Sequence, residues 1–194
     1  MKHIITALFI TSGLFSKELD LGSSMPLMNH QLADISGKTL TLSDVKGDQG
    51  TLVIFSCNTC PWVIRWEDRY VSIADAYLSK GIGMIAVNSN EGRFNGDDSM
   101  DEMIQHAMEN DYNFPYAQDP GSKLAYAFGA TKTPHIYLFD KRDKLIYRGA
   151  IDDNARDKDD VDNTYLADAI DALLAGKDIK VKTSKALGCG IKFK

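Results

Sequence analysis

Thr51-Leu-Val-Ile-Phe-Ser-Cys-Asn-Thr-Cys-Pro-Trp62 joins an apolar run to two cysteines and a proline. The run up to Ser56 is typical of a buried strand, and Pro61 is tolerated in the first turn of a helix. Cys57 and Cys60 are therefore expected at a junction between a strand and a helix. The N–H groups of a first helical turn stabilise a thiolate, so this position predicts redox chemistry, with a lowered pKa at Cys57.

The apolar pattern on either side of this junction predicts an α/β fold. Helical spacing continues from Pro61 to Lys80-Gly81, and the run 82–87 is apolar enough for a central strand covered on both faces. Further elements are expected to follow: a β-hairpin over 25–42, a helix capped by Ser99 over 99–109, an extended segment at 114–117, a helix at 122–128, a hairpin over 136–149 and a helix at 165–174. This order predicts a three-layer α/β/α sandwich with a central mixed sheet and an N-terminal β-hairpin.

Composition limits the classes of function. The 194 residues fit one domain, expected over 22–194 with a lysine-rich C-terminal tail from about 177. A net charge of −5 and a pI near 5.3 argue against a nucleic-acid partner. Apolar runs all fall short of the roughly 18 residues that a membrane span needs. The acidic stretch 152–162 lacks the glycine and glutamate positions of an EF-hand, which favours a solvated loop.

The N-terminus has the pattern of an export signal. Lys2 and His3 precede an apolar run over 4–15, and Ser16 is a small residue at a suitable cleavage point. We therefore expect a signal peptide and leader over 1–21 and a periplasmic or otherwise exported location. The alternative is an N-terminal strand or short buried helix, with a cytoplasmic location if the leader is retained.

Four motifs in this order resemble the thioredoxin-like superfamily. Within it the chain is similar to the redoxin branch, which includes peroxiredoxin-like proteins of the alkyl hydroperoxide reductase and thiol-specific antioxidant type. The resemblance covers residues 22 to 194 and implies a thioredoxin-like fold. The motifs are Cys57-Asn-Thr-Cys60-Pro61 after a strand, Thr133-Pro134 before Ile136-Tyr-Leu-Phe-Asp140, the hairpin with Tyr147-Arg-Gly-Ala-Ile-Asp152, and the ending Gly188-Cys-Gly-Ile-Lys192.

The two cysteines have distinct expected roles. The thiolate of Cys57, at an exposed helix start, would attack a substrate disulfide and form a mixed disulfide. Cys60, one turn inside, would then attack the sulfur of Cys57 and release the reduced substrate. The alternative is a pair of inert buried thiols or a static disulfide.

Other site residues follow from the resemblance. It implies a cis bond at Pro134, beside the cysteines, that presents the backbone of Thr133 to an incoming peptide. Trp62 forms either an apolar rim of the site or part of the core, and His135 either touches the groove or is an ordinary loop residue. Three roles are considered for Cys189: a resolving partner of Cys57 or Cys60, an unpaired thiol, or a third metal ligand.

Three functions compete. The leading one is a thiol–disulfide oxidoreductase with an antioxidant role, acting on a protein or small-molecule disulfide with a redox partner protein and no cofactor. The second is a thiol peroxidase, although Ile54 stands where such enzymes place a threonine, three residues before the cysteine. The third is a copper or zinc module built from the three cysteines and His135, because soft thiolates suit these metals. Superfamily copper carriers, however, have three residues between their cysteines.

Overall fold

The computed structural model describes residues 17–194, so the apolar part of the predicted export signal lies outside the described residues. Contacts with the domain begin inside the predicted leader. The N–H of Leu19 donates to the carbonyl of Phe128 at 3.0 Å, and that of Gly22 donates to the carbonyl of Leu145 at 2.8 Å. The domain therefore includes the last residues of the segment 1–21.

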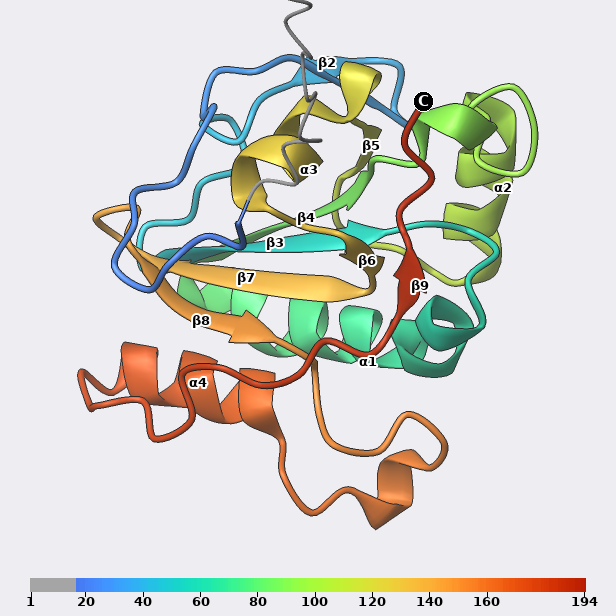
Figure 1. Ribbon diagram of the computed structural model, residues 1–194. Helices are drawn as coiled ribbons and strands as arrows, with labels where there is room; N and C mark the ends of the chain where they lie inside the picture. The colour runs from blue at the N-terminus through green and yellow to red at the C-terminus, as the bar shows by residue number, and fades with distance from the viewer. Residues whose placement is uncertain (1–16) are drawn as a thin grey trace, which may run out of the picture.

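A seven-stranded mixed sheet forms the middle layer of the molecule (Figure 1). Its order is β2-β1-β5-β4-β3-β7-β8, in which β3, β4 and β5 are parallel and the remaining pairs are antiparallel. The predicted N-terminal hairpin is confirmed as the β1–β2 pair. The strands are β1 (Leu32–Asp34), β2 (Thr39–Leu40), β3 (Gly50–Ser56), β4 (Ile82–Asn88), β5 (Tyr116–Gln118), β7 (His135–Asp140) and β8 (Leu145–Gly149).

Helices cover both faces of this sheet, which confirms the three-layer sandwich (Figure 1). One face packs against α1 (Pro61–Tyr77), α2 (Met100–Glu109) and α4 (Tyr165–Leu174), and the other against α3 (Lys123–Phe128). Short 3-10 turns occupy Leu78–Lys80, Glu91–Arg93, Pro120–Ser122 and Lys158–Asp160. In the described part of the chain, the helices are all too short or too polar to cross a membrane.

The central strand β3 explains the division into two cores. Leu52 and Ile54 pack on the face that carries α1, whereas Val53 and Phe55 pack against α3. All four side chains are fully buried. A strand covered on both faces needs apolar residues at every position, and this is the pattern of the sequence.

The helix α1 leads away from the cysteines on the first of these faces. Cys60 is its N-cap residue and Pro61 its first residue. Its buried side chains recur at intervals of three and four residues, as the sequence predicts. The helical region closes at Gly81, whose φ of 86° is the left-handed conformation that glycine adopts without strain.

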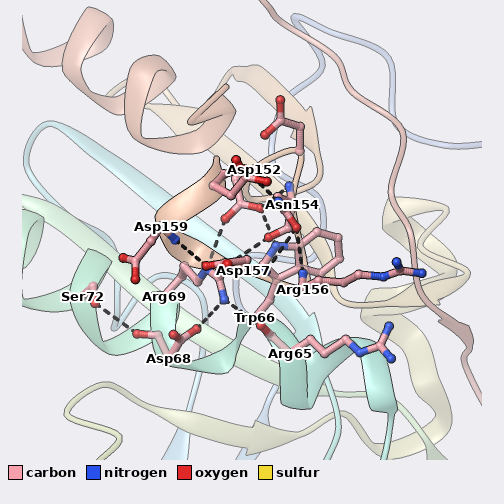
Figure 2. A network of polar contacts seen from close by, with 12 residues as sticks. Arg65, Trp66, Asp68, Arg69, Ser72, Asp152, Asn154, Arg156, Asp157 and Asp159 are labelled. Carbon is pink, nitrogen blue, oxygen red and sulfur yellow. Dashed lines mark hydrogen bonds and ion pairs between the residues drawn. The ribbon is translucent and has the colours of Figure 1, made fainter. Parts of the chain in front are cut away.

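The Asp152 carboxylate connects the acidic loop after β8 to α1 (Figure 2). Asp152 is buried and accepts hydrogen bonds from the indole N–H of Trp66 at 2.6 Å and the backbone N–H of Asn154 at 2.9 Å. Its other oxygen lies 3.2 Å from the guanidinium of Arg69. The sequence predicted a solvated loop, and this was wrong for Asp152, because its donors belong to α1, far away in the sequence.

Two further strands form a small sheet outside the main one. Thr133 in β6 (Lys132–Thr133) pairs with Cys189 in β9 (Cys189–Gly190), and Lys132 pairs with Gly190. Figure 1 shows β9, in the red C-terminal segment, beside β6 and near the start of α1. The C-terminal tail therefore has a defined place next to the Cys57–Cys60 region.

Candidate active site

The loop with the two cysteines lies at the carboxyl end of β3. The parallel pair β3–β4 aligns Ser56 with Asn88, so the polar residues that follow β4 lie next to this loop. Cys57 follows Ser56 directly, and Cys60 caps α1 with an extended backbone, φ −73° and ψ 122°. The predicted placement of the cysteines between strand and helix is confirmed.

Thr133 is the common neighbour of both cysteines. Its hydroxyl lies 3.2 Å from the Sγ of Cys57. Its carbonyl accepts a hydrogen bond from the Sγ of Cys60 at 3.1 Å. The peptide bond between Thr133 and Pro134 is cis, as the resemblance implied.

Cys189 is the third thiol at this place. It hydrogen-bonds through its side chain to Cys60, and the backbone N–H of Trp62 donates to its sulfur. The tail lies so close to Thr133 that a Cβ added at Gly188 would be 2.4 Å from the carbonyl oxygen of Thr133. The backbone of Thr133, expected to be open to a peptide, is therefore paired with the chain's own tail.

A small pocket of about 180 Å³ opens onto the cysteines. Arg93 and Lys192 place two cationic side chains in its wall. Larger hollows of about 480 and 750 Å³ lie beside the segment 177–182 and have no cysteine in their lining. The residues that line the small pocket are Cys57, Thr59, Cys60, Asn90, Arg93, Thr133, Cys189, Gly190 and Lys192.

The ionisation of the two cysteines is linked by their hydrogen bond. This bond lowers the pKa of Cys60 to about 5, against the opposing effect of burial. The same bond, and then burial, raise the pKa of Cys57. Because neighbouring groups that interact this strongly lose their protons in two separate steps, the pair carries one negative charge at neutral pH.

The sequence predicted an exposed Cys57 with the lowered pKa, and the structure corrects both points. Cys57 is 3% exposed and Cys60 4%, so the two are equally buried. The lowered pKa belongs to Cys60, which also receives backbone N–H groups from Val63 and Cys189. Cys57 lies instead near the negative charge of Asp98, which disfavours a thiolate.

Asp98 is a site residue that sequence reasoning missed. It is fully buried and accepts hydrogen bonds from the backbone N–H of Asn58 at 3.0 Å and from the side-chain amides of Asn88 at 2.8 Å and Asn90 at 2.9 Å. These contacts connect the loop between the cysteines to the end of β4. The signal in the sequence is the polar run Asn88-Ser-Asn90 directly after an apolar strand.

Trp62 and His135 lie outside the lining of the pocket. The indole of Trp62 packs 6.0 Å from that of Trp66 and contributes to the core cluster around α1. His135 is buried beside Tyr137, and burial followed by the charge of Lys132 lowers its pKa to about 4. Within residues 17–194, no group of three or more His, Cys, Asp and Glu side chains is arranged to hold a metal ion. The cysteines and His135 do not form the proposed metal centre.

The lowered pKa predicts fast alkylation of the reduced protein at neutral pH. A pair that ionises near pH 5 is a thiolate from pH 6 upward, whereas an ordinary thiol ionises near pH 8.5. The rate of reaction with iodoacetamide should stay level from pH 6 to 8 and fall as the pH drops through about 5. Mass spectrometry of the two cysteine peptides measures this rate, with the unfolded protein as control. A rate that instead rises through pH 8.5, as in the unfolded control, contradicts it.

Comparisons with known proteins identify the family of this chain. The family model described as Redoxin matches residues 20–165. A thiol-disulfide oxidoreductase ResA from Bacillus cereus is 28% identical over 137 residues, covering 69% of this chain and 73% of that protein. A solved structure of an uncharacterized conserved protein from Geobacillus kaustophilus is 36% identical and superposes with a TM-score of 0.83, covering 92% of this chain and 95% of that one.

The fold is shared with a named redox domain. The thioredoxin domain of a thiol-disulfide oxidoreductase from Bacteroides vulgatus superposes with a TM-score of 0.62 at 21% identity, over 81% of this chain and 99% of that one. At this identity the likeness shows the fold alone. The predicted thioredoxin-like fold is confirmed.

Proposed function

The chain belongs to the Redoxin family, and we propose that this thioredoxin-like redox enzyme exchanges thiols and disulfides through Cys57 and Cys60. The observation that carries the proposal is the placement of these two sulfurs in the wall of one pocket, both in contact with Thr133. Their linked ionisation supports it. A thiolate next to a second thiol is the arrangement that forms and resolves a mixed disulfide. The disulfide substrate accepts two electrons, and a dithiol redox partner supplies them.

The contacts of Thr133 support attack by Cys57. When Cys57 carries the charge, the hydroxyl of Thr133 donates to its sulfur, and the protonated sulfur of Cys60 donates to the carbonyl of Thr133. The proton reaches this position by crossing the hydrogen bond between the two sulfurs. Cys60 is the stronger acid of the two. The form with a Cys57 thiolate and a Cys60 thiol nevertheless satisfies both the hydroxyl and the carbonyl of Thr133 at the moment of attack.

The proposed cycle has two exchange steps. The thiolate of Cys57 attacks one sulfur of the substrate disulfide, and the other sulfur leaves as a thiolate that takes up a proton. Cys60 loses its proton and attacks the sulfur of Cys57, which releases the second substrate sulfur. The substrate has gained two electrons, Cys57 and Cys60 are joined, and the redox partner reduces this bond again.

Peroxide reduction is a second candidate, with one observation in its favour. The sequence lacks a threonine three residues before Cys57, but the structure supplies the hydroxyl of Thr133 at 3.2 Å from the sulfur. Attack of the Cys57 thiolate on a peroxide would give a sulfenic acid and an alcohol or water. Condensation with Cys60 would then release water and give the same disulfide. This activity is the antioxidant role that the sequence predicts.

Two assays distinguish these candidates. The reduced protein is mixed in turn with insulin, with a small aromatic disulfide and with hydrogen peroxide, and each reaction is supplied with dithiothreitol. Faster reduction of a disulfide than of peroxide supports the proposed function, whereas fast consumption of peroxide alone supports the second candidate. Rates equal to those of dithiothreitol alone with all three substrates contradict both.

We also propose that the protein is exported. The support is the apolar run 4–15 before Ser16, together with the hydrogen bond that Leu19 donates to Phe128 four residues beyond this run. In the native host, the mature protein should be found outside the cytoplasm, with an N-terminus near Lys17. Fractionation and N-terminal sequencing measure this. A full-length chain in the cytoplasmic fraction contradicts it.

A further inference from the structure

Cys60 lies between two other thiols. It hydrogen-bonds to Cys57 on one side and to Cys189 on the other. All three side chains line the same pocket. They also share one neighbour, since Thr133 contacts the sulfurs of Cys57 and Cys60 and pairs through its backbone with Cys189.

We propose that Cys189 is a third redox residue, which takes over the disulfide from Cys57 by bonding to Cys60. This proposal rests on the proposed function, because it needs the Cys57–Cys60 disulfide as its starting point. Cys60 then forms a disulfide with either of its neighbours. Cys57 returns to the thiol form while the protein as a whole stays oxidised.

The step conserves atoms and electrons. The thiolate of Cys189 attacks the sulfur of Cys60, a bond between Cys189 and Cys60 forms, and the bond between Cys60 and Cys57 breaks. Cys57 leaves as a thiolate and takes up the proton that Cys189 has lost. One disulfide and one thiol are present before and after, so no external oxidant or reductant takes part.

The tail holds Cys189 in place for this exchange. The N–H of Ile191 donates to the carbonyl of Thr131 at 3.0 Å, and that of Lys192 donates to the side-chain oxygen of Asn90 at 2.8 Å. The N–H of Gly92 donates to the carbonyl of Lys192 at 2.8 Å. These contacts, with Thr131 on one side and with Asn90 and Gly92 on the other, fix the end of β9 next to the cysteine loop. The sulfurs of Cys60 and Cys189 can therefore react without a large movement of the chain.

The contact with Cys60 is the second cause, after burial, that keeps Cys189 in the thiol form. In the reduced protein, burial and then the hydrogen bond with Cys60 raise the pKa of Cys189. Once Cys60 is in a disulfide it carries no negative charge, and this second cause is removed. The N–H of Trp62 and the charge of Lys192, which both favour the thiolate, remain. Oxidation of the first pair thus prepares Cys189 to react.

The Cys57→Ser variant tests the proposal directly. Treated with a small excess of diamide, it should lose both remaining thiols and yield a peptide in which Cys60 is joined to Cys189, within a monomer. The matched control Cys57→Ser with Cys189→Ala should keep the thiol of Cys60 under the same conditions. Thiol titration and peptide mass spectrometry give the result. Retention of both thiols in Cys57→Ser, under conditions that oxidise the wild-type protein fully, overturns the proposal.

A second measurement does not depend on the folding of that variant. A sample of the oxidised wild-type protein should contain two populations of molecules, one with the Cys57–Cys60 disulfide and one with the Cys60–Cys189 disulfide. Oxidised Cys189→Ala should contain the first population alone. If the oxidised wild-type protein yields the Cys57–Cys60 disulfide and no Cys60–Cys189 disulfide, the inference is overturned and the proposed function stays intact. Loss of the Cys57–Cys60 disulfide in Cys189→Ala would instead contradict the proposed function.

Discussion

Replacement of Cys57 by serine should abolish disulfide reduction, with a loss on the order of 10³-fold or more in kcat/KM. A serine hydroxyl in this place stays protonated at neutral pH, and it is a far weaker nucleophile than a thiolate. The variant keeps the size of the side chain and can keep the contact with the hydroxyl of Thr133. Turnover of insulin or of a small disulfide, measured beside the thermal unfolding curve, gives the result.

The matched variant Cys60→Ser should fail at a different step. Its Cys57 still attacks the substrate, but the serine cannot resolve the mixed disulfide, so a covalent adduct on Cys57 should accumulate. Cys189 contacts Cys60 rather than Cys57, so it should not restore turnover. Unchanged turnover in Cys57→Ser, or an adduct found on Cys60 in the wild-type protein, would show that the two roles are reversed.

Loss of the Asp152 carboxylate should destabilise the protein by about 3 kcal/mol. Asp152→Ala leaves the buried indole N–H of Trp66 without its acceptor and removes the carboxylate that faces the Nε of Arg69, whose other two nitrogens keep their contacts. An unpaired buried donor or charge costs more than the hydrogen bond itself contributes. Urea unfolding followed by tryptophan fluorescence measures the change, because Trp66 reports on the same contact.

Asp159 is the matched control in the same loop (Figure 2). Its side chain is exposed, so Asp159→Ala should change the free energy of unfolding by less than about 0.5 kcal/mol. Equal effects of the two substitutions would mean that total loop charge, and not the contact with α1, determines stability.

The local patterns of the sequence predicted most of the fold. The uninterrupted apolar run of β3 identified a strand buried on both faces, and Ser99 identified the start of α2, where its side chain accepts from Glu102. These features depend on neighbours in the chain, which a sequence displays directly. Asp152 was assigned wrongly because its donors, Trp66 and Arg69, are 86 and 83 positions away and give no local signal.

The candidate site likewise combines features that the sequence predicted with features that depend on distant residues. The place of Cys57 and Cys60 follows from the strand and helix that flank them, and the cis bond at Pro134 from the resemblance. The sequence could not choose among the three roles considered for Cys189, because β9 reaches the site by pairing Cys189 with Thr133, 56 positions earlier. Cys57 likewise contacts Thr133, which lies 76 positions later in the sequence and gives no local signal.

The pairing of β9 with β6 has a consequence for the choice of substrate. The segment 188–192 behaves as a tethered competitor, whose effective concentration at the backbone of Thr133 stays constant however dilute the protein is. An extended polypeptide can pair with the backbone of Thr133 only if it displaces the segment 188–192. A compact disulfide can enter the neighbouring pocket, which Arg93 and Lys192 line, without displacing it. We therefore expect compact disulfides to be reduced faster than disulfides held in extended polypeptides.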